Sequence, residues 1–126
     1  DIEKNQCVLV RRDNREKVFV SLDDLETEIP RLLDAVQQGL YDAALARREK
    51  MTYTAATLDE LKDIADNKPG FIKAMWCGSR ECEEKLKEAT GGVKSRCIPF
   101  EEEHLADTCV CCGKKAKHMV YWGKQY

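Results

Sequence analysis

The sequence predicts an α+β protein in which a terminal β-hairpin, a long helix and a small second module follow one another. Two β-rich runs at 7–12 and 17–21 are separated by a short polar turn, as in a hairpin. An apolar stripe at helical spacing comes next, and from residue 57 onward short helical and strand patterns alternate. The two halves therefore differ in architecture, and a two-module organisation is expected.

The long helix follows the hairpin directly. Ser21 is a candidate N-cap, and the helix is expected to end near Lys50. Its apolar side chains form one stripe: Leu32, Leu33, Val36, Leu40 and Ala44. Pro30 is expected to kink this helix or to restart it at its first turn. The helix is expected to connect the two modules.

The second module has the predicted order helix, strand, helix, strand, cysteine turn and strand. Its first helix begins at a capping box, Thr57 to Glu60, and ends before Pro69 and Gly70. The later elements are a strand at 71–76, a helix at 80–89 with Ser79 as N-cap, a strand at 93–98, a cysteine turn at 109–113 and a strand at 118–122. We expect these elements to form one small domain.

The composition and net charge of the chain argue against several classes of protein. The 126 residues carry 21 Lys+Arg against 23 Asp+Glu, and a net charge of −2 argues against an autonomous nucleic-acid binder. No apolar run approaches bilayer length and no secretory signal is present, so a cytoplasmic protein without a membrane partner is expected. The odd number of cysteines, seven, favours a reducing compartment. Because the chain starts without methionine on a strand-like run, we interpret it as the tail of a longer polypeptide.

Two close cysteine pairs have the spacing of a metal site. Cys77 and Cys82 form one pair, and Cys109 and Cys112, followed directly by glycine, form the other. Four thiolates satisfy tetrahedral Zn²⁺ with no open position, which indicates a structural and not a catalytic ion. Cys111 lies inside the second pair and is the alternative to Cys112 as fourth ligand. Reduced packed cysteines, or a redox pair of Cys109 and Cys112, are the competing interpretations.

Few residues outside the two cysteine pairs are candidates for a functional role. Arg11 and Lys17 on the hairpin are possible contacts of nucleic-acid phosphates, although the sequence alone favours an exposed strand face as their explanation. Cys7 and Cys97 lie in apolar strands and are expected to be buried. Neither histidine has a catalytic partner that spacing identifies, so no catalytic residue is predicted.

Five segments, taken in order, carry a family resemblance. They are DIEKNQ at 1–6, NKPGFIKAMWCG at 67–78, SRCIPF at 95–100, CVCCGK at 109–114 and VYWGKQY at 120–126. Together they resemble the C-terminal part of class II prolyl-tRNA synthetases of the archaeal/eukaryote-like type, over essentially the whole chain. The resemblance implies that residues 1–22 end an anticodon-binding domain and that 57–126 form a two-layer β-α-β-α-β zinc-binding domain with antiparallel sheet. Residues 23–56 would be the connecting helix.

The resemblance also implies a function. The resemblance implies that the zinc-binding cysteines of the family correspond to Cys77, Cys82, Cys109 and Cys112. It also implies that Tyr126 corresponds to the family's terminal tyrosine, whose carboxylate approaches the catalytic domain. The parent enzyme, expected to be a homodimer, would join proline to tRNA(Pro) using ATP and Mg²⁺ in a catalytic domain absent from this chain. We therefore expect a non-catalytic region that braces the catalytic and anticodon-binding domains of the same polypeptide. The alternative is a stand-alone zinc-ribbon module that binds RNA.

Overall fold

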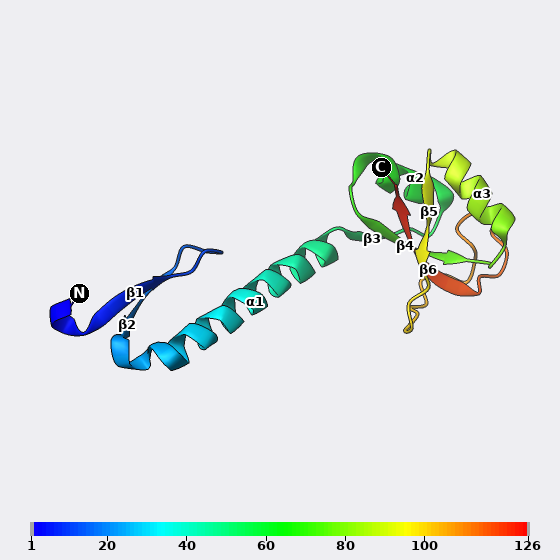
Figure 1. Cartoon of the computed structure of the whole chain (residues 1–126). Coiled ribbons are helices and arrows are strands. Elements are labelled where there is room, and N and C mark those ends of the chain that lie inside the picture. The colour runs from blue at the N-terminus through cyan, green and yellow to red at the C-terminus, as the bar shows by residue number, and fades with distance from the viewer. Residues whose placement is uncertain (1, 126) are drawn as a thin grey trace. The chain divides into compact units, whose positions relative to one another are not determined.

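A computed structural model describes residues 2–125 of the chain, which form two compact units divided between Arg47 and Arg48. Figure 1 follows the elements of both units along the chain. The first unit holds a hairpin and most of a long helix, and the second holds a four-stranded sheet with two short helices. Among the described helices, none is both long and apolar enough to cross a membrane.

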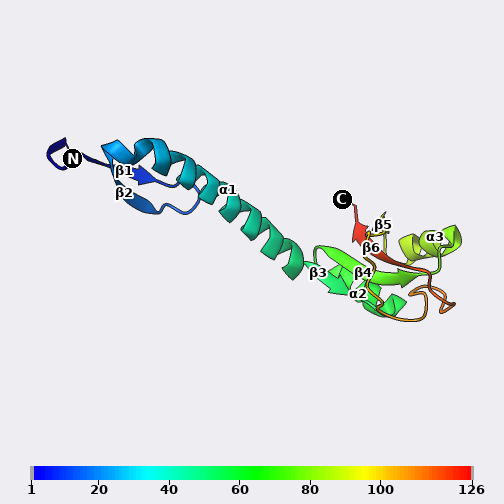
Figure 2. The same cartoon turned by 90° about the horizontal axis from the view of Figure 1, so that it is seen from below.

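The first unit contains the predicted hairpin beside the predicted helix. Its elements are η1 (Ile2–Lys4), β1 (Gln6–Val10), β2 (Lys17–Ser21), η2 (Leu22–Asp24) and α1 (Leu25–Lys50). β1 and β2 pair antiparallel, and Figure 2 shows them alongside the first half of α1. The Ser21 hydroxyl accepts a hydrogen bond from the backbone N–H of Asp23, which starts the helical segment as predicted.

The long helix differs from its prediction at Pro30. α1 is continuous through this residue, so the expected restart does not occur. Because Pro30 lies near the start of the helix, its missing N–H removes one hydrogen bond, to the Glu26 carbonyl, and the rest of the helix continues. The apolar stripe is also less buried than its pattern suggests, since Leu33 is 63% exposed and Leu40 55% exposed.

Both faces of the hairpin are apolar. Cys7 pairs with Val20 across the strands, and Val20 is buried. The opposite face carries Val8, which is 44% exposed, paired with Phe19, which is 69% exposed. Strands with two apolar faces are typical of sheets covered on both sides, so this hairpin has the pattern of a piece of a larger sheet.

The second unit is a four-stranded mixed sheet in the order β3-β4-β6-β5. Its elements are β3 (Thr52–Thr54), α2 (Leu58–Asn67), β4 (Phe71–Trp76), α3 (Arg80–Ala89), β5 (Val93–Cys97) and β6 (His118–Lys124). β6 pairs antiparallel with both β4 and β5, whereas β3 joins β4 in parallel. The α+β fold class is confirmed, and β3, which the sequence did not predict, makes the sheet mixed.

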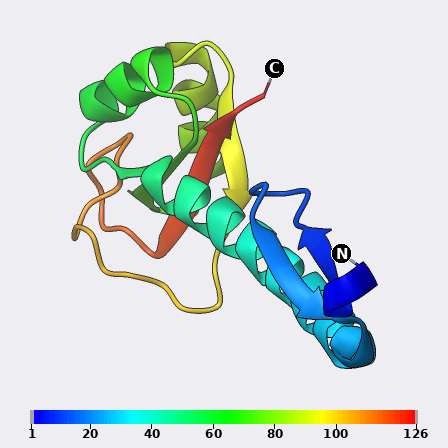
Figure 3. The same ribbon diagram turned by 90° about the vertical axis from the view of Figure 1, so that its left-hand side faces the viewer.

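Both short helices cover one face of this sheet (Figure 3). Leu61 of α2 and Leu86 of α3 are 0% exposed and belong to the same core as Trp122 of β6. Ile72 pairs with Trp122, and Ala74 with Val120, so these four core side chains come from the same face of β4 and β6. The alternate residues, including Lys73 and Tyr121, therefore lie on the face away from the helices.

Local signals explain where the elements of the second unit begin and end. Thr57 accepts a hydrogen bond from the N–H of Glu60, whose carboxylate accepts one in return, so the predicted capping box is present. Gly70 has a φ of +136°, and a β-carbon there would overlap the Met51 carbonyl oxygen. Only glycine fits this turn between α2 and β4. Ser79 occupies the N-cap of α3 but makes no side-chain capping bond.

Candidate metal centre

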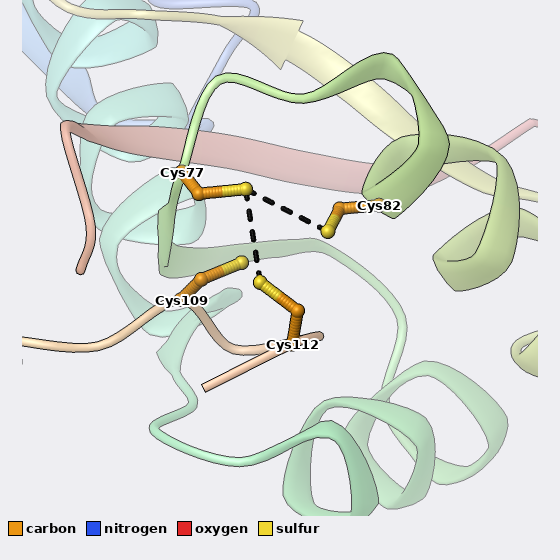
Figure 4. A group of neighbouring side chains, drawn as sticks. All are labelled: Cys77, Cys82, Cys109 and Cys112. Atoms are coloured by element: carbon orange, nitrogen blue, oxygen red, sulfur yellow. Dashed lines mark hydrogen bonds between the residues drawn. The ribbon is translucent and has the colours of Figure 1, made fainter. Parts of the chain in front are cut away.

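Four cysteine sulfurs converge at one end of the sheet of the second unit (Figure 4). Cys77 directly follows β4, Cys82 lies in the first turn of α3, and Cys109 and Cys112 lie in the turn before β6. Their Sγ atoms all lie within 4.8 Å of one another. The Cys77 sulfur is 3.6 Å from that of Cys82 and 3.8 Å from that of Cys112. The two pairs, 27 or more residues apart in the chain, thus form one cluster.

The spacing of the sulfurs fits a tetrahedral metal ion. Zn–S bonds of about 2.3 Å in a tetrahedron separate the sulfurs by about 3.8 Å, close to the observed distances. A disulfide needs about 2.05 Å, and all seven cysteines are free thiols. Four soft ligands around one point fill every position of Zn²⁺ and leave none for water. The donor set therefore fits structural zinc.

Backbone hydrogen bonds shape the turn that carries Cys109 and Cys112. The N–H of Gly113 donates to the Cys109 carbonyl at 3.0 Å, and the N–H of Cys109 donates to the Lys114 carbonyl at 2.7 Å. Gly113 adopts a φ of +68°, in the left-handed region that favours glycine. This glycine lets the chain reverse tightly enough for both sulfurs to point to the same side.

The same turn is tied to the end of β4. The N–H of Val110 donates to the Met75 carbonyl at 2.9 Å, and the N–H of Lys117 donates to the Trp76 carbonyl at 2.8 Å. Val110 is also part of the hydrophobic core. Because Cys77 follows Trp76 directly, these bonds bring the second cysteine pair beside the first.

The surroundings of the thiols affect their ionisation in opposite directions. Burial raises the pKa of Cys82, and burial is also the main reason why the pKa of Cys109 is raised. A backbone hydrogen bond from Lys114 lowers the pKa of Cys112 to about 7. Clustered thiols resist carrying several negative charges, and a divalent cation among them removes that obstacle.

The other cysteines lie outside this group. Cys111 is half-buried and does not belong to the cluster of four, to which Cys112 contributes the fourth sulfur. Cys97 is exposed, so the prediction that it is buried is wrong. A register shift between Ser95 and Cys97 interrupts the alternation of β5, which explains the error. Cys7 is half-buried.

The predicted contacts of tRNA occupy different surroundings. The Arg11 side chain is only 14% exposed, and its Nη2 donates to Asp13 at 2.7 Å and to the Ala35 carbonyl at 3.1 Å. The hydrogen bond from Arg11 lowers the pKa of Asp13. Lys17 is exposed at the start of β2. Tyr126 lies outside the described residues. The roles given to Arg11, Lys17 and Tyr126 remain predictions.

One feature of the second unit is not predicted by the sequence. A groove of about 710 Å³ lies on the sheet face away from the helices, and its lining includes Arg48, Phe71, Arg96 and Tyr121. These residues come from segments that only the folded sheet brings together. The alternation of Phe71 and Lys73 with buried residues in β4 was the signal that could have indicated this face.

A family model and several curated proteins match the chain. The family model described as "Prolyl-tRNA synthetase, C-terminal" matches residues 58–126. A proline–tRNA ligase of Clostridium novyi (strain NT) is 66% identical over all 126 residues, which cover 26% of that protein. Proline–tRNA ligase 2 of Bacillus cereus (strain ZK / E33L) is 62% identical over the same share of each chain. The chain thus spans about a quarter of the length of these relatives.

A solved structure is similar over the full chain as well. It is the crystal structure of prolyl-tRNA synthetase from Cryptosporidium parvum complexed with L-proline and AMP. The TM-score is 0.92 at 34% identity, covering 100% of the present chain and 27% of the Cryptosporidium chain. At this level of identity the likeness extends to sequence as well as fold.

Proposed function

The chain belongs to the prolyl-tRNA synthetase C-terminal family, and from this premise we propose that it is a zinc-stapled structural region of a longer enzyme. That enzyme would join proline to tRNA(Pro) using ATP and Mg²⁺ in a separate catalytic domain. The observation that carries the proposal is the cluster of four sulfurs within 4.8 Å of one another. A closed set of thiolates suits a structural ion and offers no site for a reacting group.

The proposed ligands are Cys77, Cys82, Cys109 and Cys112, with Cys111 outside the coordination sphere. The size of the unit supports a stabilising role, because the core of a domain of fewer than about 80 residues supplies little stability and a structural metal adds to it. Bound zinc would link the end of β4, the start of α3 and the cysteine turn, and its binding free energy would add to that of folding.

The rest of the chain would attach this domain to the parent enzyme. We propose that residues 1–22 end an anticodon-binding domain, which the two apolar faces of the hairpin support. Residues 23–56 would connect it to the zinc domain at 57–126, and β3 near the end of this connection pairs with β4 of that domain. Exposed Lys17 is the better candidate for a tRNA phosphate, because the Arg11 guanidinium already bridges the hairpin turn to α1.

Further assignments concern the whole enzyme. It would be cytoplasmic and homodimeric, with the zinc domain bracing its catalytic and anticodon-binding domains and with Tyr126 directed toward the catalytic domain. The archaeal/eukaryote-like type is supported by the likeness to the Cryptosporidium parvum enzyme along the full chain. The 126-residue chain itself would be inactive, so a pyrophosphate-exchange assay should remain at background.

Metal analysis of the purified chain tests the central proposal. We expect one zinc per chain, and removal of the ion by a strong chelator should abolish the cooperative thermal transition of the second unit. Cys77→Ser should lose zinc and that transition together. The matched control is Cys97→Ser, an exposed cysteine outside the cluster, which should keep both. A chelated protein with unchanged circular dichroism and melting would contradict a structural role for zinc.

A further inference from the structure

The zinc proposal leaves unused a groove on the sheet face away from the helices. It has a volume of about 710 Å³ and lies within the second unit. Phe71 of β4 and Tyr121 of β6 line it, with ring centroids 6.4 Å apart and planes inclined at 84°. Phe71 is 42% exposed, an unusual position for a phenylalanine in an inner strand. The middle of the groove is therefore aromatic and accessible.

Two arginines, one near each edge strand of the sheet, line the groove beside this aromatic centre. Arg48 lies beside β3, since its carbonyl accepts a hydrogen bond from the Thr52 hydroxyl at 2.7 Å. Arg96 belongs to β5, the outer strand on the other side. Three strand spacings separate the outer strands by about 14 Å. The groove is thus lined by one arginine from each edge of the sheet together with the two rings, and the Arg96 side chain reaches over β6.

The guanidinium groups retain donors for a ligand. Arg96 Nη2 donates to the Gly123 carbonyl at 2.9 Å, which orients the side chain and leaves its other N–H groups to bind. Neither Arg48 nor Arg96 forms an ion pair with any carboxylate among residues 2–125. By contrast, Lys73 is paired with Glu103 at 2.7 Å. The arginines are thus the cations of the groove that can meet an external anion.

We propose that this groove binds a short stretch of single-stranded RNA. A base would pack against Phe71 and Tyr121, and the phosphates on either side would meet Arg48 and Arg96. A mononucleotide carries its phosphate at one end only, whereas two arginines from opposite edges of the sheet line this groove, which favours a strand with successive phosphates. The Thr54 hydroxyl also lines the groove and can hydrogen-bond a ribose 2′-hydroxyl.

The charge of the chain limits the affinity of this site. The net charge is −2, and the groove itself contains Glu49 and Glu103 as well as its cations. Binding should therefore be weak, should depend on stacking as much as on phosphate contacts, and should weaken further as salt rises. A weak site of this kind would act within a larger enzyme that already holds its RNA elsewhere, which goes beyond the structural role proposed above.

Fluorescence anisotropy with the zinc-loaded 126-residue chain tests the proposal. The probe is a fluorescein-labelled single-stranded RNA of about ten nucleotides of mixed A and C, at low salt. Phe71→Leu keeps apolar bulk but removes a ring, and should raise the dissociation constant at least about fivefold. Arg48→Gln and Arg96→Gln should each reduce the salt slope by about one phosphate. The matched control is Arg80→Gln on α3, whose side chain is 89% exposed, and it should bind like the unchanged protein.

Several results would overturn the proposal. They are no anisotropy change at low salt, as expected if a protein segment covers this face, or the same affinity for Phe71→Leu as for the unchanged chain. Competition by AMP as strong as that of the RNA strand would refute the two-phosphate arrangement. Zinc content and melting are measured on every sample, so that failure of the groove is distinguished from failure of the metal site.

Discussion

The carboxylate of Glu102 accepts a hydrogen bond from the backbone N–H of Met119 at 2.6 Å, and its other oxygen lies 3.3 Å from Nδ1 of His118. Glu102 belongs to the long loop between β5 and β6, whereas Met119 is a buried residue of β6. The Glu102 side chain therefore attaches this loop to β6, the strand that follows the cysteine turn. Because the bonded form is the carboxylate, this attachment depends on pH.

Glu102→Gln should weaken the acid sensitivity of the second unit. The hydrogen bond from Met119, followed by that from His118, holds the pKa of Glu102 below its ordinary value of 4.5. Its stabilisation is therefore complete above that ordinary value and is lost as pH falls through the lowered folded-state pKa. Urea-unfolding midpoints measured against pH should fall less steeply below about pH 5 in the variant. Glu101→Gln, an exposed neighbour, is the control, and identical profiles for all three proteins would contradict the prediction.

Cys112→Ser and Cys111→Ser should separate the two candidates for the fourth ligand. Only the Cys112 sulfur belongs to the cluster, so its replacement should lower zinc affinity strongly and destabilise the second unit. Cys111→Ser should retain one zinc per chain. Metal analysis after dialysis against a weak chelator measures the difference. Equal retention by both variants would mean that either thiol can complete the site.

Gly70→Ala should be more damaging than Gly92→Ala. Both glycines have φ above +120°, so an L-residue at either position is strained by about 1–3 kcal/mol. At Gly70 the added β-carbon also overlaps the Met51 carbonyl oxygen, whereas at Gly92 it meets nothing within 4 Å. The unfolding free energy of the zinc-loaded chain should therefore fall further for Gly70→Ala. Equal losses would show that the turn after α2 can relax.

Leu86→Ala should destabilise the second unit by about 2–5 kcal/mol, because this side chain is 0% exposed in the core. Leu33→Ala makes the same chemical change in another helix, but Leu33 is 63% exposed. The control should leave the unfolding of the second unit within about 0.5 kcal/mol of the unchanged chain. Denaturant unfolding followed by tryptophan fluorescence reports on this unit, since both tryptophans lie in it.

Helices and strands whose ends are marked by glycine or by a capping residue were predicted correctly. The bounds of β4 and α3 agree with the structure because Gly70, Ser79 and Gly91 mark their ends in the sequence. The four clustered cysteines were also identified, since metal-site spacing is a local pattern within each pair. That these two pairs meet depends on long-range packing; their spacing and soft donor type predicted one shared site, and the family resemblance agreed with it.

Features created by strand pairing were missed. β3 is three residues long and pairs only with β4, so no periodicity in its own sequence predicts it. The prediction for Cys97 is wrong because a register shift at the end of β5 alters which side chains are covered. The groove could not be predicted either, because its two arginines lie near opposite edges of the sheet and only strand pairing brings them together. Such features depend on tertiary contacts and not on local pattern.

The two apolar faces of the hairpin have a practical consequence for the chain in solution. Phe19 is 69% exposed on a two-stranded sheet, and no third strand among residues 2–125 pairs with its outer edges. We expect such a surface to promote aggregation as the concentration rises, through edge-to-edge contacts that a complete sheet prevents. Cleavage between Arg47 and Arg48 removes this surface and leaves the four clustered cysteines together. The shorter piece is thus the better starting point for crystallisation and for spectroscopy of the metal.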